Sequence, residues 1–133
     1  MISSRILVVD DDPIIRKVID SNLRARHFDV ILAEDGKSAL QIMEKTQPDL
    51  VILDIMMPGI DGIEVCRRIR EWSEVPIVFL TARDELYNKL TGFGIGADHY
   101  ITKPFAVDEL VARMRALLWR RGNRATFTKS QNQ

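Results

Sequence analysis

Ile6-Leu-Val-Val-Asp-Asp-Asp-Pro13 is a run of four apolar residues, followed by three aspartates and a proline. A short run that is apolar at every position indicates a strand that is covered on both faces, as in a parallel sheet. Pro13 is typical of the first turn of a helix, so a helix should follow directly. The stretch therefore predicts a buried strand whose carboxyl end carries three carboxylates just before a helix.

The same alternation of short apolar runs and helical segments continues along the chain. The predicted strands are residues 5–9, 30–33, 50–53, 77–80 and 99–101. The predicted helices begin at Pro13, contain Ala39 to Met43, contain Ile63 to Ile69, span about residues 84–95, and run from Val107 to about Arg121. Five strands alternating strictly with five helices predict an α/β domain built on an open parallel sheet with right-handed crossovers.

Composition limits the function classes. The 133 residues suffice for one domain, with 46% hydrophobic and 29% charged residues. The formal net charge is zero, which favours neither nucleic acid nor a membrane as a direct partner. The single cysteine, Cys66, excludes an internal disulfide, and no run approaches the roughly 20 apolar residues of a membrane helix. Together with the absence of a signal peptide, these features predict a cytoplasmic location.

The sequence also predicts where the domain ends. Residues 122–133 show no helical or strand periodicity in their apolar residues, which indicates a linker or disordered tail after a domain of residues 1–121.

Polar side chains follow the predicted strands. Residues 10–12 follow the first strand, Asp54 the third, Thr81 the fourth and Lys103 the fifth. Ligands of open α/β sheets bind outside the carboxyl ends of the strands, so these groups should meet at one edge. Neighbouring carboxylates repel one another unless a cation joins them, and an oxygen-only ligand set favours Mg²⁺. A metal, an ammonium and a hydroxyl stabilise charge in phosphoryl transfer, and an ionised aspartate is a competent nucleophile.

Four stretches of the chain resemble the receiver domain of bacterial two-component response regulators, in the branch that includes OmpR and PhoB. Besides the opening stretch these are Pro48-Asp-Leu-Val-Ile-Leu-Asp-Ile-Met-Met-Pro-Gly-Ile-Asp-Gly62, Pro76-Ile-Val-Phe-Leu-Thr-Ala-Arg83 and Gly96-Ala-Asp-His-Tyr-Ile-Thr-Lys-Pro-Phe105. The resemblance covers about residues 5–121. It implies a flavodoxin-like, doubly wound five-stranded parallel sheet in the order 2-1-3-4-5 with five helices.

The resemblance also implies roles for residues at the strand ends. Asp54 is the residue that is phosphorylated, and Mg²⁺ is held by Asp10, Asp11, Asp54 and the backbone carbonyl of Met56. Lys103 binds the phosphoryl group, and Thr81 and Tyr100 form the switch pair. The Lys103–Pro104 peptide bond is cis. Such a domain catalyses only its own phosphorylation and dephosphorylation and is a switch rather than an enzyme.

Partners follow from the same resemblance. A sensor histidine kinase is the phosphoryl donor, and phosphorylation produces a homodimer. The residues expected at the dimer interface are Lys89, Asp98, His99, Glu109, Arg113 and Arg120. The branch usually has an aspartate at the position of His99, opposite an arginine that matches Arg120, so this chain departs from the branch pattern at one ion pair of the dimer. DNA is contacted only through a winged-helix domain that would follow residues 122–133, and no membrane is involved.

Three other interpretations compete with this one. The aspartates of residues 10–12 could merely form a solvated turn, and Asp12 is well placed to cap the following helix. A haloacid-dehalogenase-type phosphatase would use Asp10 as nucleophile and Asp12 as acid, but Ile14 does not fit its motif and Asp54 would have no role. A flavodoxin-like cofactor-binding module would need backbone N–H groups free to hold a phosphate after the first strand, where this chain carries three carboxylates.

Overall fold

The computed structural model describes residues 3–82 and 98–131, with side chains as far as Gly122. Its strands and helices are β1 (Arg5–Val9), α1 (Pro13–Ala25), β2 (Asp29–Ala33), α2 (Gly36–Thr46), β3 (Leu50–Asp54), α3 (Gly62–Arg70), β4 (Ile77–Ala82), β5 (His99–Lys103) and α5 (Val107–Gln131). The predicted helix over residues 84–95 and the interface residue Lys89 lie outside the described residues.

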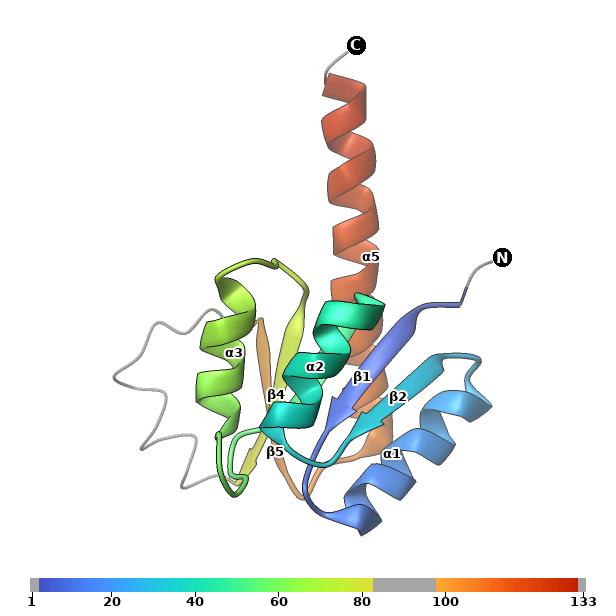
Figure 1. Cartoon of the computed structure of the whole chain (residues 1–133). Helices are drawn as coiled ribbons and strands as arrows, with labels where there is room; N and C mark the ends of the chain where they lie inside the picture. Colours follow the sequence, from blue (N-terminus) through green and yellow to red (C-terminus); the bar gives the residue numbers. More distant parts are fainter. Residues whose placement is uncertain (1–2, 83–97, 132–133) are drawn as a thin grey trace.

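The five strands form one parallel sheet in the order β2-β1-β3-β4-β5, which confirms the expected topology. Because every pairing is parallel, all five strands end at the same edge of the sheet, and the arrows of β1 and β2 in Figure 1 show this direction. The ladders extend past the apolar runs, since Asp54 pairs with Leu80 and Ala82 pairs with Lys103. Three of the predicted strands therefore ended one or two residues too early, because their last residues are polar or small.

Each central strand sends alternate side chains into two separate cores. Leu7 and Val9 pack with residues of α2 and α3, whereas Ile6 and Val8 pack with residues of α1 and α5. All four side chains are fully buried. At about 1.5–3 kcal/mol for each large aliphatic side chain removed from water, these two cores supply most of the driving force for folding. Continuous apolar strands are stable here because helices cover both faces of the sheet.

Aspartates cap the helices that follow the strands. The side chains of Asp12, Asp35 and Asp61 accept hydrogen bonds from backbone N–H groups in the first turns of α1, α2 and α3. Asp12 accepts from the N–H of Ile14 at 2.9 Å, so the predicted cap of the first helix is confirmed. A cap also satisfies N–H groups that a helix leaves unpaired at its start.

Helix α5 is longer than the sequence pattern predicts. We expected its end near Arg121, but it continues to Gln131 and projects beyond the edge of the sheet opposite to the strand ends (Figure 1). One glycine costs a helix only about 1 kcal/mol, and residues 123–131 contain no proline. The loss of apolar period after Leu118 marks where the helix leaves the core, not where it ends. Whether this segment leads to a further domain stays a prediction.

Gly62 brings the start of α3 directly against the end of β3. Its N–H donates to the Ile55 carbonyl at 2.8 Å. A Cβ at this position would lie 2.1 Å from the backbone oxygen of Asp54. Only glycine permits this approach, and the approach fixes the backbone on which the Asp54 side chain is carried.

Candidate functional site

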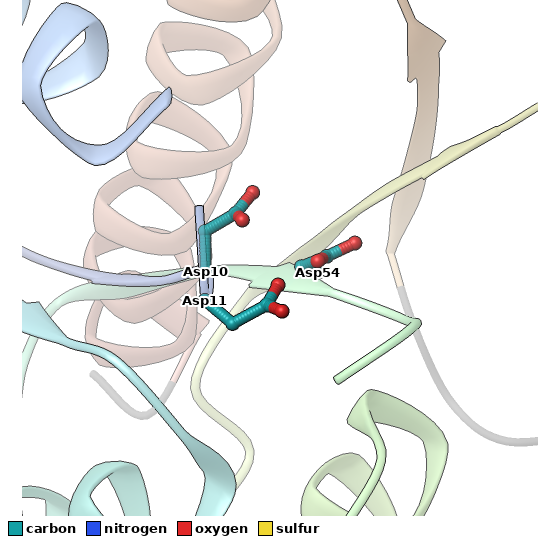
Figure 2. Close-up of side chains that lie close together, drawn as sticks. All are labelled: Asp10, Asp11 and Asp54. Atoms are coloured by element: carbon teal, nitrogen blue, oxygen red, sulfur yellow. The ribbon is translucent and has the colours of Figure 1, made fainter. Parts of the chain in front are cut away.

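Three carboxylates meet at the carboxyl edge of the sheet. Asp10 and Asp11 follow β1, and Asp54 is the last residue of β3. Figure 2 shows the Asp54 side chain beside those of Asp10 and Asp11, and one carboxylate oxygen from each lies within 4.8 Å of the others. Asp10 and Asp54 are buried, whereas Asp11 is exposed. The predicted acidic group therefore forms, with one member open to solvent.

Lys103 supplies a positive charge at this site. Its Nζ lies 3.0 Å from Asp10 Oδ2 and 3.3 Å from Asp54 Oδ1. Burial alone would lower the pKa of Lys103, but its hydrogen bond to Asp10 and the charge of Asp54 raise it, so the lysine is charged at neutral pH. The lysine precedes a cis peptide bond to Pro104, as the resemblance implied. The sequence placed Lys103 at the site but did not predict that it would pair with Asp10.

The charges of this cluster do not balance. Three carboxylates face one ammonium, which leaves two negative charges when all the groups are ionised. Burial, followed by the nearby charge of Asp10, raises the pKa of Asp54 from 3.8 to about 7, despite Lys103. The charge of Lys103 therefore does not offset the combined effect of burial and of repulsion by Asp10. An all-oxygen donor set that needs two more positive charges fits Mg²⁺, so the residues present suit the metal that the sequence predicted.

Hydrogen bonds limit what two of the aspartates can do. Asp10 Oδ1 accepts from the backbone N–H of Asp12 at 2.9 Å, while its other oxygen faces Lys103. Asp12 uses its own carboxylate to cap α1. A phosphatase that relied on Asp10 as nucleophile and Asp12 as acid would need both carboxylates free. The geometry leaves Asp54 as the better candidate for a nucleophile.

The predicted switch residues lie on neighbouring strands. Thr81 is fully buried near the end of β4, and its hydroxyl donates to the Ala82 carbonyl at 3.0 Å. Tyr100 on β5 is half-buried and stacks on Phe79, with ring centroids 5.8 Å apart. Burial raises the pKa of the Tyr100 phenol, so it is neutral at physiological pH. Met56 follows Asp54 by two residues, and its side chain is exposed.

Three of the predicted dimer residues, Asp98, His99 and Arg113, make contacts within one chain. Asp98 Oδ2 accepts from the backbone N–H of Ile77 at 2.8 Å and from Arg70 at 3.1 Å. An Nη atom of Arg113 lies 3.1 Å from Nδ1 of His99. The resemblance assigned these residues to contacts with a partner chain, and it did not imply these contacts within one chain. Glu109 and Arg120 are exposed on α5.

A family model described as the response regulator receiver domain matches residues 6–115. The probable transcriptional regulator ycf27 of Guillardia theta is 47% identical over 124 residues, which cover 93% of this chain and 48% of that protein. The response regulator MprA of Mycolicibacterium vanbaalenii is 50% identical over 117 residues, which cover 87% of this chain and 51% of that protein. The chain thus spans about half the length of these curated relatives.

Solved structures show the same fold. The receiver domain of the Francisella response regulator 1452 superposes with a TM-score of 0.82 at 36% identity, over 90% of this chain and 99% of that one. The receiver domain of Klebsiella pneumoniae RstA, in its BeF₃-activated form, gives a TM-score of 0.79 at 38% identity, over 86% and 97% of the two chains. Within the described residues, no helix has the length and apolar character needed to cross a membrane.

Proposed function

Because the chain belongs to the response regulator receiver family, in the OmpR/PhoB-like branch, we propose that it accepts a phosphoryl group on Asp54 from a sensor histidine kinase. Phosphoryl transfer to Asp54 requires Mg²⁺, which Asp10, Asp11, Asp54 and the Met56 carbonyl would hold. The reaction takes place in the cytoplasm. It changes the conformation of one surface of the domain and does not turn a substrate into a released product. The observation that supports this most is the position of Asp54, which is buried between two other carboxylates and one lysine.

Each residue of the site has a part in the transfer. A carboxylate oxygen of Asp54 attacks the phosphorus of the phosphohistidine, so a P–O bond forms and the P–N bond breaks. The imidazole leaves as a neutral ring after it takes up a proton. Mg²⁺, when bound, offsets the charge of the carboxylates and of the phosphoryl oxygens. Lys103 and the Thr81 hydroxyl are close enough to the end of the sheet to bind the remaining phosphoryl oxygens.

Phosphorylation then changes a surface through Thr81 and Tyr100. The Thr81 hydroxyl leaves the Ala82 carbonyl for the phosphoryl group. The Tyr100 ring, which now stacks on Phe79, then turns inward as the space beside Thr81 changes. The resulting surface around β5 and α5 forms a homodimer. Asp98, His99 and Arg113 must exchange their present contacts for contacts with the partner if they take part. In a longer protein that contains this domain, dimerisation would control transcription through a DNA-binding domain. The relative ycf27 is named a probable transcriptional regulator, which supports this role.

The test is phosphorylation by a small donor. Acetyl phosphate with Mg²⁺ should modify the wild-type chain, and the acyl phosphate should be detected by intact mass and lost at alkaline pH. The Asp54→Asn variant should stay unmodified. The matched variant Asp12→Asn keeps the backbone N–H that bonds Asp10 and changes only the side chain that caps α1, so it should be modified normally. EDTA should block the reaction. A normal yield of phosphoprotein from Asp54→Asn would disprove the assignment.

A further inference from the structure

Arg16 reaches back from the second turn of α1 to the acidic loop. Its Nη1 donates a hydrogen bond of 2.7 Å to the backbone carbonyl of Asp10. The backbone N–H of Asp10 donates to the Ala33 carbonyl of β2 at 3.2 Å. Asp10 comes just after the last ladder residue of β1, so its carbonyl has no partner strand and Arg16 satisfies it instead. The guanidinium is half-buried and makes this contact without touching a carboxylate of the site.

This contact lies next to Asp11 in the backbone. The carbonyl of Asp10 belongs to the peptide plane that carries the nitrogen of Asp11, so fixing the carbonyl restricts the backbone of Asp11. The same loop is held on its other side by the N–H of Asp12, which donates to Asp10 Oδ1. Among the residues that the structure describes, no hydrogen bond or ion pair reaches the exposed carboxylate of Asp11. Its position therefore depends on the backbone that Arg16 and Asp12 hold.

We propose that Arg16 is a positioning residue for the metal site: it fixes the Asp10–Asp11 peptide so that the Asp11 carboxylate faces Asp10 and Asp54. This inference rests on the proposed function, because it assigns Arg16 a role in binding the Mg²⁺ that phosphorylation needs. Arg16 itself does not bind the metal. Groups that orient metal ligands through hydrogen bonds change metal affinity by about 10- to 100-fold when they are removed.

Positioning and simple charge predict opposite effects of removing Arg16. A guanidinium near a cation site repels the cation, so if charge alone mattered its loss would strengthen Mg²⁺ binding. If Arg16 positions Asp11, its loss lets the loop sample other conformations, and Mg²⁺ binding weakens. The direction of the change in Mg²⁺ affinity therefore separates the two roles.

The experiment measures the Mg²⁺ dissociation constant by isothermal titration calorimetry for the full chain and three variants. Arg16→Met removes both the donor and the charge, while Arg16→Lys keeps a charged donor. Arg24→Met is the matched control, since Arg24 lies on the same helix and also donates to a backbone carbonyl, that of Val30, at 3.0 Å. The thermal midpoint of each protein in EDTA shows whether a variant is merely less stable.

Arg16→Met should weaken Mg²⁺ binding about tenfold. Arg16→Lys should recover most of that loss, and Arg24→Met should stay within about twofold of the wild type, even if its thermal midpoint falls further. Wild-type or tighter affinity in Arg16→Met would overturn the inference, and so would an equal loss in Arg24→Met. If the wild-type chain itself binds no Mg²⁺, the proposed function fails together with the inference; failure in Arg16→Met alone leaves the proposed function intact.

Discussion

Lys103 Nζ lies closer to Asp10 than to Asp54, at 3.0 Å against 3.3 Å. The ammonium therefore holds a position between two carboxylates that would also bind the metal. An ammonium and a cation compete for the same carboxylate charge, although the lysine is still needed when a phosphoryl group brings further negative charge. Lys103 should therefore weaken the binding of Mg²⁺ but promote phosphorylation.

The Lys103→Met variant tests this assignment. We expect it to bind Mg²⁺ at least as tightly as the wild type, because a competing cation is gone. Its phosphorylation by acetyl phosphate should slow by about 10²-fold, since one stabilising group for the developing charge is lost. Calorimetry with Mg²⁺ and single-turnover phosphorylation measure the two effects. A large loss of Mg²⁺ affinity would show that Lys103 does not compete with the metal.

Gly62 provides a second test through the backbone. In Gly62→Ala, the new Cβ would meet the backbone oxygen of Asp54 at 2.1 Å and Ile55 Cα at 2.8 Å. Backbone atoms of a central strand yield little, so we expect a loss of about 1–3 kcal/mol in the free energy of unfolding. Urea denaturation measures it, and Mg²⁺ affinity should fall as Asp54 moves.

Gly122→Ala is the control for that substitution. Gly122 lies within α5, and a Cβ there would meet nothing within 4 Å. Replacing a helical glycine with alanine should raise stability by up to about 1 kcal/mol. Equal effects of the two substitutions would contradict the close approach of α3 to β3.

The sheet and most of the site could be predicted because they depend on patterns along the chain. Runs that are apolar at every position indicate strands buried on both faces, and the cores beside Leu7 and Ile6 confirm it. The order of the strands came from the resemblance alone, whereas the meeting of Asp10 and Asp54 at one edge followed from the alternation. The strand ends were harder to place, because Lys103 belongs to the ladder but is polar.

Contacts made by long side chains could not be predicted. Arg16 reaches a carbonyl six residues back, and Arg113 reaches the ring of His99. No sequence period encodes such contacts, because they depend on rotamers and on neighbouring elements. The length of α5 was misjudged for another reason: an exposed helix needs no apolar stripe, so polar residues beyond Leu118 carried no signal.

Asp54 should make the stability of the metal-free protein depend on pH. Its pKa is raised from 3.8 to about 7, so between those values the folded state binds more protons than the unfolded state. The free energy of unfolding should therefore fall as pH rises from about 4 to about 7. The Asp54→Asn variant lacks this charge. Its free energy of unfolding should exceed that of the wild type by about 1–4 kcal/mol above pH 7, and should differ little from it near pH 4.

Urea denaturation in EDTA at pH 5 and pH 8 measures this difference. Added Mg²⁺ should stabilise the wild type more than Asp54→Asn at pH 8, because it replaces the missing positive charge. A difference between the two proteins that is the same at both pH values would mean that Asp54 keeps an ordinary pKa.

The contact between Arg113 and His99 leads to the last prediction. Arg113 can donate to Nδ1 only when that nitrogen carries no proton, so the contact requires a neutral ring. Burial, followed by the charges of Arg113 and Arg120, lowers the pKa of His99 below 6.5, although Asp98 opposes this. The folded state thus binds fewer protons than the unfolded state, and stability should fall as pH drops through about 6.5. The effect should stay below about 1 kcal/mol, because the site is partly exposed.

NMR titration of the His99 ring measures this pKa directly. Arg113→Met should move it back toward 6.5, and His99→Gln should remove its contribution to the pH dependence of stability. If the activated dimer uses the surface of β5 and α5, its association should weaken only below about pH 6.5, where protonated His99 repels both arginines. His99→Asp should accept from Arg113 at every pH above about 5 and flatten that dependence. Sedimentation of the beryllofluoride form across this pH range measures the dimer association constant. If the pH dependence of this constant is the same in His99→Asp as in the wild type, His99 does not face the dimer contact.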